Sequence, residues 1–168
     1  INQGGKGYDK VITVTTKEEA PQKPYNLDVR NVTSKEATVA WSINGPRPGK
    51  TVYTVRLVAD SPAMNKTFTV LGFSNTSFEL TGLEEYWHYS LTVEASTSRG
   101  SNLSDTASIN TTAGTAGQVS KLSVKTGCGD NAYVTARVSW SLPEILQRNG
   151  PISSFYVQQE AIVNGTFS

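Results

Sequence analysis

Apolar and polar residues alternate along most of the chain, and the spacing of three to four residues that marks a helix is absent. Short runs rich in Val, Thr, Tyr and Ile are separated by clusters of Gly, Pro, Asn and Ser, at intervals typical of a β-sandwich. From residue 24 onward this pattern predicts an all-β fold of seven strands. The predicted strands are 26–32, 37–43, 52–59, 66–71, 77–81, 87–97 and 106–111.

The alternation also predicts which side chains face inward. Two apolar sheet faces packed about 10 Å apart would form the core, and hydrophobic residues, 37% of the chain, suffice to fill it. Trp41 should be the largest contributor because its ring has the most apolar area to bury. The inward positions are Val39 and Trp41 on the second strand, Tyr53, Val55 and Leu57 on the third, and Tyr89, Leu91, Val93 and Ala95 on the sixth.

Several spaced segments resemble a fibronectin type III repeat. They are Pro24-Tyr25-Asn26-Leu27, Val39-Ala40-Trp41, Tyr53-Thr54-Val55, and the stretch from Leu83 to Ala95, which is similar to the family's Leu…Tyr-x-Val-x-Val-x-Ala signature. The resemblance implies a seven-stranded antiparallel β-sandwich of the fibronectin type III or immunoglobulin-like kind, arranged in tandem.

The resemblance also implies a role for Tyr89. It would be the tyrosine corner, whose hydroxyl bonds backbone near the turn between the fifth and sixth strands. Two residues depart from the family pattern: Glu85 stands where Pro is usual, and Trp87 where Thr is usual. We expect Trp87 to be partly exposed.

The flanking sequence repeats the same pattern. Residues 10–16 resemble the last strand of a repeat, and 119–125 and 135–141 resemble the first two strands of another, with Trp140 matching Trp41. Residues 155–157 are then predicted as its third strand. The predicted domains are 1–20, the last strand of a preceding repeat with a linker; 21–113, a complete repeat; and 114–168, the N-terminal half of a following repeat.

A half repeat of three strands would leave one apolar sheet face uncovered. Truncation, disorder and completion by a second chain are three ways to account for it, and the sequence leaves them open. What precedes and follows the chain is equally open: no signal peptide is found, so a secretion signal would lie upstream.

Asparagine is the most informative residue type. Six of the eleven asparagines stand in Asn-x-Ser/Thr sequons, where chance would give roughly two or three. This predicts N-linked glycans and passage through a secretory pathway; the alternative is accidental enrichment in a chain rich in Ser and Thr. The predicted acceptors are Asn31, Asn65, Asn75, Asn102, Asn110 and Asn164.

The single cysteine, Cys128, cannot form a disulfide within the chain. It either pairs with a residue outside this fragment or is a small buried apolar residue.

Charge and motifs exclude several functions. The net charge of +1 gives no reason to expect nucleic acid as a partner. No apolar run reaches the roughly 20 residues that span a membrane, so any membrane attachment would lie outside this chain. The single histidine, His88, has no nucleophile or acid in a catalytic arrangement, and no metal or cofactor motif is present. We therefore expect no enzyme activity in this segment and no cofactor.

The longest predicted loop, residues 98–105, is the candidate binding loop, with Arg99, Gly100 and Ser101 as its candidate contacts. An integrin-type Arg-Gly-Asp motif is ruled out because Ser101 follows Gly100. The alternative, which we favour, is a flexible solvated loop carrying a glycan at Asn102. The loop at 44–50 has two prolines and two cations and is expected to be a turn.

The sequence therefore predicts an extracellular ligand-binding or spacer segment of a single-pass cell-surface receptor or adhesion protein. The resemblance extends to the ectodomains of receptor-type tyrosine phosphatases, in which a phosphatase would lie across the membrane. The alternative is a structural extracellular-matrix protein built from the same repeats. Expected partners are a protein ligand or a cell-surface or matrix component, together with N-linked glycans.

Overall fold

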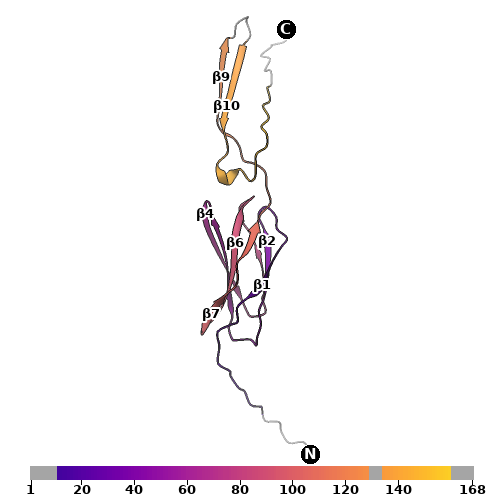
Figure 1. Ribbon diagram of the computed structural model, residues 1–168, viewed down its shortest axis with the longest axis vertical. Helices are drawn as coiled ribbons and strands as arrows, with labels where there is room; N and C mark the ends of the chain where they lie inside the picture. The colour runs from indigo at the N-terminus through magenta and orange to yellow at the C-terminus, as the bar shows by residue number, and fades with distance from the viewer. Residues whose placement is uncertain (1–10, 129–133, 160–168) are drawn as a thin grey trace, which may run out of the picture. The chain divides into compact units, whose positions relative to one another are not determined.

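A computed structural model describes residues 11–128 and 134–159 (Figure 1). These residues form ten β-strands and one short 3₁₀ helix, η1 (Ile145–Gln147). Asn164, one of the predicted glycan acceptors, lies outside the described residues.

Two antiparallel sheets make a β-sandwich. The first has the order β1-β2-β5, with bounds β1 (Tyr25–Arg30), β2 (Ala37–Ser42) and β5 (Ser77–Leu80). The second has the order β4-β3-β6-β7, and β8 also pairs with β6; its bounds are β3 (Val52–Asp60), β4 (Ala63–Leu71), β6 (His88–Thr97), β7 (Gly100–Leu103) and β8 (Ala107–Asn110). The predicted all-β sandwich is confirmed.

The register of β3 and β6 aligns the predicted inward residues. The cross-strand pairs are Tyr53 with Ala95, Val55 with Val93, and Leu57 with Leu91. All six side chains are fully buried, as is Tyr89. Because neighbours in a strand point to opposite faces, this register places every inward residue of β3 against an apolar partner.

Trp41 is the aromatic centre of this core, as predicted. Its side chain is buried, and its ring meets that of Tyr53 edge to face, with centroids 5.1 Å apart. The Tyr53 hydroxyl donates to the Phe73 carbonyl oxygen at 2.8 Å. Burial raises the pKa of Tyr53. Such a buried aromatic pair contributes a few kcal/mol, about 1 of them from ring geometry.

Contacts within the chain group it into two compact units, which divide the described residues as follows: 11–28, 39–78 and 90–107 in one, and 29–38, 79–89, 108–128 and 134–159 in the other. The first unit buries Trp41 and the inward residues of β3. The second buries Leu80, Leu83 and Ile109.

The second unit also contains a hairpin of two antiparallel strands, β9 (Ser120–Cys128) and β10 (Val134–Ser141), seen side by side in Figure 1. These strands match the predicted positions. Their apolar residues Leu122, Val124 and Val134 are exposed.

Three strand predictions need correction. The predicted strand 66–71 begins earlier, at Ala63, because a tight turn after Asp60 lets β4 pair with the whole of β3. The predicted strand 106–111 is confirmed as β8, whereas β7 was not predicted and lies in the segment expected to be a loop. Residues 10–16 were predicted as a strand, yet 11–16 lack regular structure, and so does the predicted strand 155–157. A strand needs a hydrogen-bonded neighbour, and no neighbouring strand pairs with either segment among the described residues.

Candidate binding surface and glycan acceptors

The predicted binding loop is a β-hairpin and not a flexible loop. Strand β7 pairs with the end of β6, from Thr97 with Gly100 to Glu94 with Leu103, which leaves Ser98 and Arg99 as the turn. The Arg99 N–H donates to Thr97 Oγ1 at 3.2 Å. A two-residue turn with glycine beside it suits a hairpin. The expectation of a flexible loop is therefore wrong, because ladder hydrogen bonds hold this segment.

Ser104 lies between β7 and β8, and its side chain takes the place of a backbone acceptor in the ladder with β6. Its hydroxyl accepts from the Val93 N–H at 2.9 Å and donates to the Asp105 carbonyl oxygen at 2.8 Å. Ser104 also donates its own N–H to the Val93 carbonyl oxygen at 2.9 Å. This buried serine therefore keeps the chain hydrogen-bonded to β6 where β7 ends and before β8 begins.

The N-terminal linker, residues 17–23, is hydrogen-bonded to two loops at this end of the first unit. The Glu19 N–H donates to the Pro48 carbonyl oxygen at 2.9 Å, and its own carbonyl accepts from Thr97 Oγ1 at 2.6 Å. The carbonyl of Pro21 accepts from Asn102 Nδ2 at 2.8 Å. The linker therefore lies against the β6–β7 hairpin, beside the predicted contact residue Gly100.

Glu18 joins both loops through its side chain. Its carboxylate accepts from the Lys50 N–H at 2.8 Å and from the Ser98 hydroxyl. The Ser98 bond, followed by the Lys50 bond, lowers the pKa of Glu18. These contacts join Glu18 to residues 32 and 80 positions away in the sequence, and no local pattern could have predicted them.

The three predicted contact residues therefore differ in availability. Arg99 lies exposed at the hairpin turn. A Cβ on Gly100 would lie 3.3 Å from Ala20 Cβ, so the linker already occupies the space beside this residue. The Ser101 hydroxyl donates to the Glu94 carboxylate. Of the three, Arg99 is best placed to meet a ligand.

The predicted loop at 44–50 forms a turn beside the linker. Together they line a shallow hollow of about 270 Å³, to which the cations Arg47 and Lys50 contribute. Lys23 and Asp105 form an ion pair of 2.6 Å nearby, with side chains 49% and 88% exposed. Ion pairs this exposed add less than about 1 kcal/mol.

Tyr89 makes the predicted corner. Its hydroxyl accepts from the Glu84 N–H at 2.9 Å, and burial raises the pKa of Tyr89. Trp87 is partly exposed, as expected. Glu85, the second departure from the family pattern, has a side chain only 12% exposed and accepts from the Ser34 hydroxyl at 3.2 Å.

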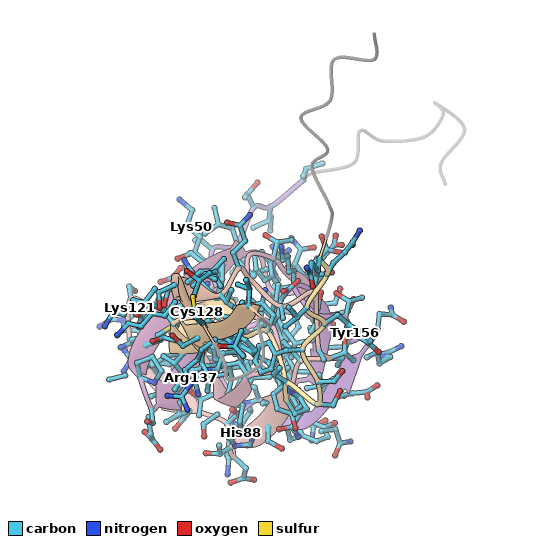
Figure 2. All side chains as sticks on the ribbon, turned by 90° about the horizontal axis from the view of Figure 1, so that it is seen from above. Lys50, His88, Lys121, Cys128, Arg137 and Tyr156 are labelled. Atoms are coloured by element: carbon cyan, nitrogen blue, oxygen red, sulfur yellow. The ribbon has the colours of Figure 1, made fainter. Side chains whose placement is uncertain are left out.

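His88 points outward, at the rim of the view in Figure 2. Its Nδ1 lies 2.7 Å from Asn110 Oδ1. In residues 11–128 and 134–159, no group of three or more His, Cys, Asp or Glu side chains could hold a metal ion. No helix in those ranges has the length and apolar character to cross a bilayer.

Five of the six predicted glycan acceptors can be placed, and all five are exposed: Asn31, Asn65, Asn75, Asn102 and Asn110. An exposed amide is what a glycan requires in the folded protein. The structure gives Asn75 Nδ2 a bond of 2.6 Å to the Leu71 carbonyl oxygen, and Asn102 its bond to the linker. Asn65 stands in the middle of β4.

Cys128 ends strand β9 with an exposed thiol (Figure 2). Exposure does not fit the alternative of a small buried apolar residue. Pairing with a cysteine outside this chain stays a prediction.

An apolar groove of about 310 Å³ lies along the β9–β10 hairpin. Trp140 and Phe155 are among the residues that line it, and their ring centroids lie 5.3 Å apart. Trp140 is half-buried, whereas the corresponding Trp41 is 4% exposed.

The sheet order and the corner at Tyr89 define the class: a β-sandwich module of the immunoglobulin-like kind. The family model of the fibronectin type III domain matches residues 19–112. The chain therefore belongs to the fibronectin type III domain family, and the resemblance noted in the sequence is confirmed.

Two relatives are similar to part of the chain. It is 32% identical over 106 residues to the phosphatidylinositol phosphatase PTPRQ of Rattus norvegicus, and 30% identical over 106 residues to that of Homo sapiens. In both cases the match covers 60% of this chain and 4% of the relative. The chain thus spans a small fraction of the length of these relatives.

Solved structures are also similar to part of the chain. A protein described as a myokine structure has a TM-score of 0.50 at 22% identity, covering 55% of this chain and 98% of that one. The third fibronectin III domain of the human KIAA0343 protein has a TM-score of 0.49 at 25% identity, covering 66% and 98%. The first likeness shows the fold alone.

Proposed function

We propose that residues 19–112 form an N-glycosylated spacer and ligand-binding module in the extracellular part of a single-pass cell-surface receptor. The observation that carries this proposal is the similarity over 106 residues to PTPRQ. That relative is named a phosphatase, yet the matched family is non-catalytic. A phosphatase domain would therefore lie elsewhere in the same polypeptide.

The exposed sequon asparagines support an extracellular location. Five acceptors lie on the surface of one small module, where a secretory pathway would glycosylate them. A protein or matrix ligand would meet the hairpin turn at Arg99, because the linker lies beside Gly100 and the Ser101 hydroxyl is bonded to Glu94.

We also propose that the module is one of a tandem series, with 1–20 ending a preceding repeat and 114–168 beginning the next. Two equivalent hydrogen bonds support this. The Glu19 N–H donates to Pro48 at 2.9 Å and the Gly117 N–H to Gln147 at 2.7 Å. Each acceptor is the seventh residue after a tryptophan, Trp41 or Trp140. Both linkers thus contact the following sequence in the same way.

Surface labelling tests the location. The full-length protein, expressed in cultured animal cells, should react with a membrane-impermeant biotin reagent within residues 19–112 and lose mass on glycosidase treatment. Labelling of these residues only after the cells are permeabilised would contradict the proposal.

A further inference from the structure

The five placed sequons share a position in the topology. Asn65, Asn102 and Asn110 lie in β4, β7 and β8; Asn31 directly follows β1, and Asn75 lies two residues before β5. In the order β1-β2-β5, the strands β1 and β5 are edges. In the other sheet, β4 is one edge and β7 with β8 is the other. The central strands β2, β3 and β6 contain no sequon.

The central strands β3 and β6 also offer exposed positions, although fewer than the edge strands do. Their outward residues include Arg56 on β3 and Ser90 on β6, both exposed. The edge strands together are about as long as the central ones. A glycan could therefore be attached to either kind of strand, and the three sequons that lie within strands are all on edge strands.

An edge strand has a physical need for such protection. It is hydrogen-bonded to a strand on one side only, and its other side can pair with another chain. Strand β4 is the longest edge, with nine residues in register with β3. A second strand must approach to within about 4.8 Å to pair, and a branched glycan on the edge occupies that space.

We propose that the N-glycans of this module block its open sheet edges and so prevent edge-to-edge pairing between copies of this chain. The proposal rests on the proposed glycosylation. It assigns the glycans a site-specific role, distinct from a general increase in solubility.

Asn65 gives the cleanest test, because the structure shows no side-chain hydrogen bond for it that a substitution would break. The chain is secreted from a eukaryotic host as wild type, as Asn65→Gln and as Thr67→Val, both of which remove the sequon on β4. Thr69→Val is the control, because it changes an exposed residue of β4 and keeps the sequon. The β9–β10 hairpin is the same in wild type, variants and control, so any self-association through it contributes equally to every measurement.

We expect both sequon variants to self-associate at least about tenfold more strongly than wild type or control, measured by sedimentation equilibrium. Amides of β4 should also exchange more slowly in the associated state. If either variant stays as monomeric as wild type while retaining its fold, the proposal fails.

A relocated glycan separates edge blocking from general solubility. Ser90→Asn, added to Asn65→Gln, completes a sequon with Leu91 and Thr92 on the central strand β6. The number of glycans is restored but β4 stays open, so self-association should persist. Return to the wild-type monomer would overturn the proposal. Glycopeptide mass analysis tests the premise separately: an unoccupied Asn65 in wild type would refute the glycosylation itself.

Discussion

Single hydroxyl groups hold the turns of this sandwich in place. Tyr89 is fully buried, and its hydroxyl is the acceptor for the Glu84 N–H at the turn before β6. The Ser98 hydroxyl likewise holds the N-terminal linker, by donating to the Glu18 carboxylate. At this scale, stability depends on whether each buried or constrained polar atom keeps its partner.

Tyr89→Phe should destabilise the protein by about 1–2 kcal/mol, because the Glu84 N–H loses its acceptor in a partly buried place. Urea unfolding, followed by tryptophan fluorescence, measures the loss. Tyr156→Phe is the matched control: Tyr156 is 96% exposed, so the same loss of a hydroxyl should change stability by less than about 0.5 kcal/mol. Equal effects of the two changes would contradict the role given to Tyr89.

The lowered pKa of Glu18 makes the linker contacts pH-dependent. A carboxyl whose pKa is lower in the folded state stabilises that state above its unfolded pKa, and the contribution is lost as the pH falls through the folded value. The contacts should therefore be complete at neutral pH and weaken below about pH 4.5, the ordinary value. A carbon NMR titration of the Glu18 carboxyl follows this directly.

Ser98→Ala should raise the pKa of Glu18 toward its ordinary value, since the Ser98 hydroxyl is the main cause of the shift. Ser108→Ala, an exposed serine on β8, should leave it unchanged. A Glu18 pKa that does not respond to Ser98→Ala would show that the Ser98 hydroxyl does not bond the Glu18 carboxylate.

At the scale of elements, the strands could be predicted and the joins between them could not. Alternation identified β2, β3 and β6 with their buried faces, because burial in a strand follows a period of two. Strand β7 was not predicted, because it forms only by pairing with β6, and the Ser104 side chain that follows it accepts from the Val93 N–H on β6. The candidate loop was misjudged for the same reason: its polar composition fits both a solvated loop and a paired edge strand.

Ser104→Ala should cost about 1–3 kcal/mol, because it leaves the buried Val93 N–H without its hydroxyl acceptor. Protein from bacteria is used, so that loss of the Asn102 sequon has no effect. Ser108→Ala on β8, where the hydroxyl is exposed, is the control and should cost less than about 0.5 kcal/mol. An unchanged midpoint for Ser104→Ala would mean that the bond between the Ser104 hydroxyl and the Val93 N–H does not stabilise the interruption between β7 and β8.

At the scale of the whole molecule, the described residues differ sharply in how well their apolar side chains are covered. Strand β6 carries Leu91 and Val93 with no exposed surface. The β9–β10 hairpin carries Leu122 and Val124, which are 63% and 58% exposed. Two strands without a covered face are marginal in water. Equal regularity in the backbone therefore does not imply equal stability.

Amide hydrogen exchange should reveal this difference within one sample of the chain. Opening β6 exposes buried apolar surface, whereas opening the hairpin exposes little that water does not already reach. We expect amides of β6 to exchange at least roughly 100-fold more slowly than those of β9 and β10. Because both come from the same molecule, pH and temperature cancel in the comparison. Protection of β9 and β10 equal to that of β6 would mean that the apolar groove at Trp140 is covered in solution, for example by a second copy, and a concentration series would then make that protection vary.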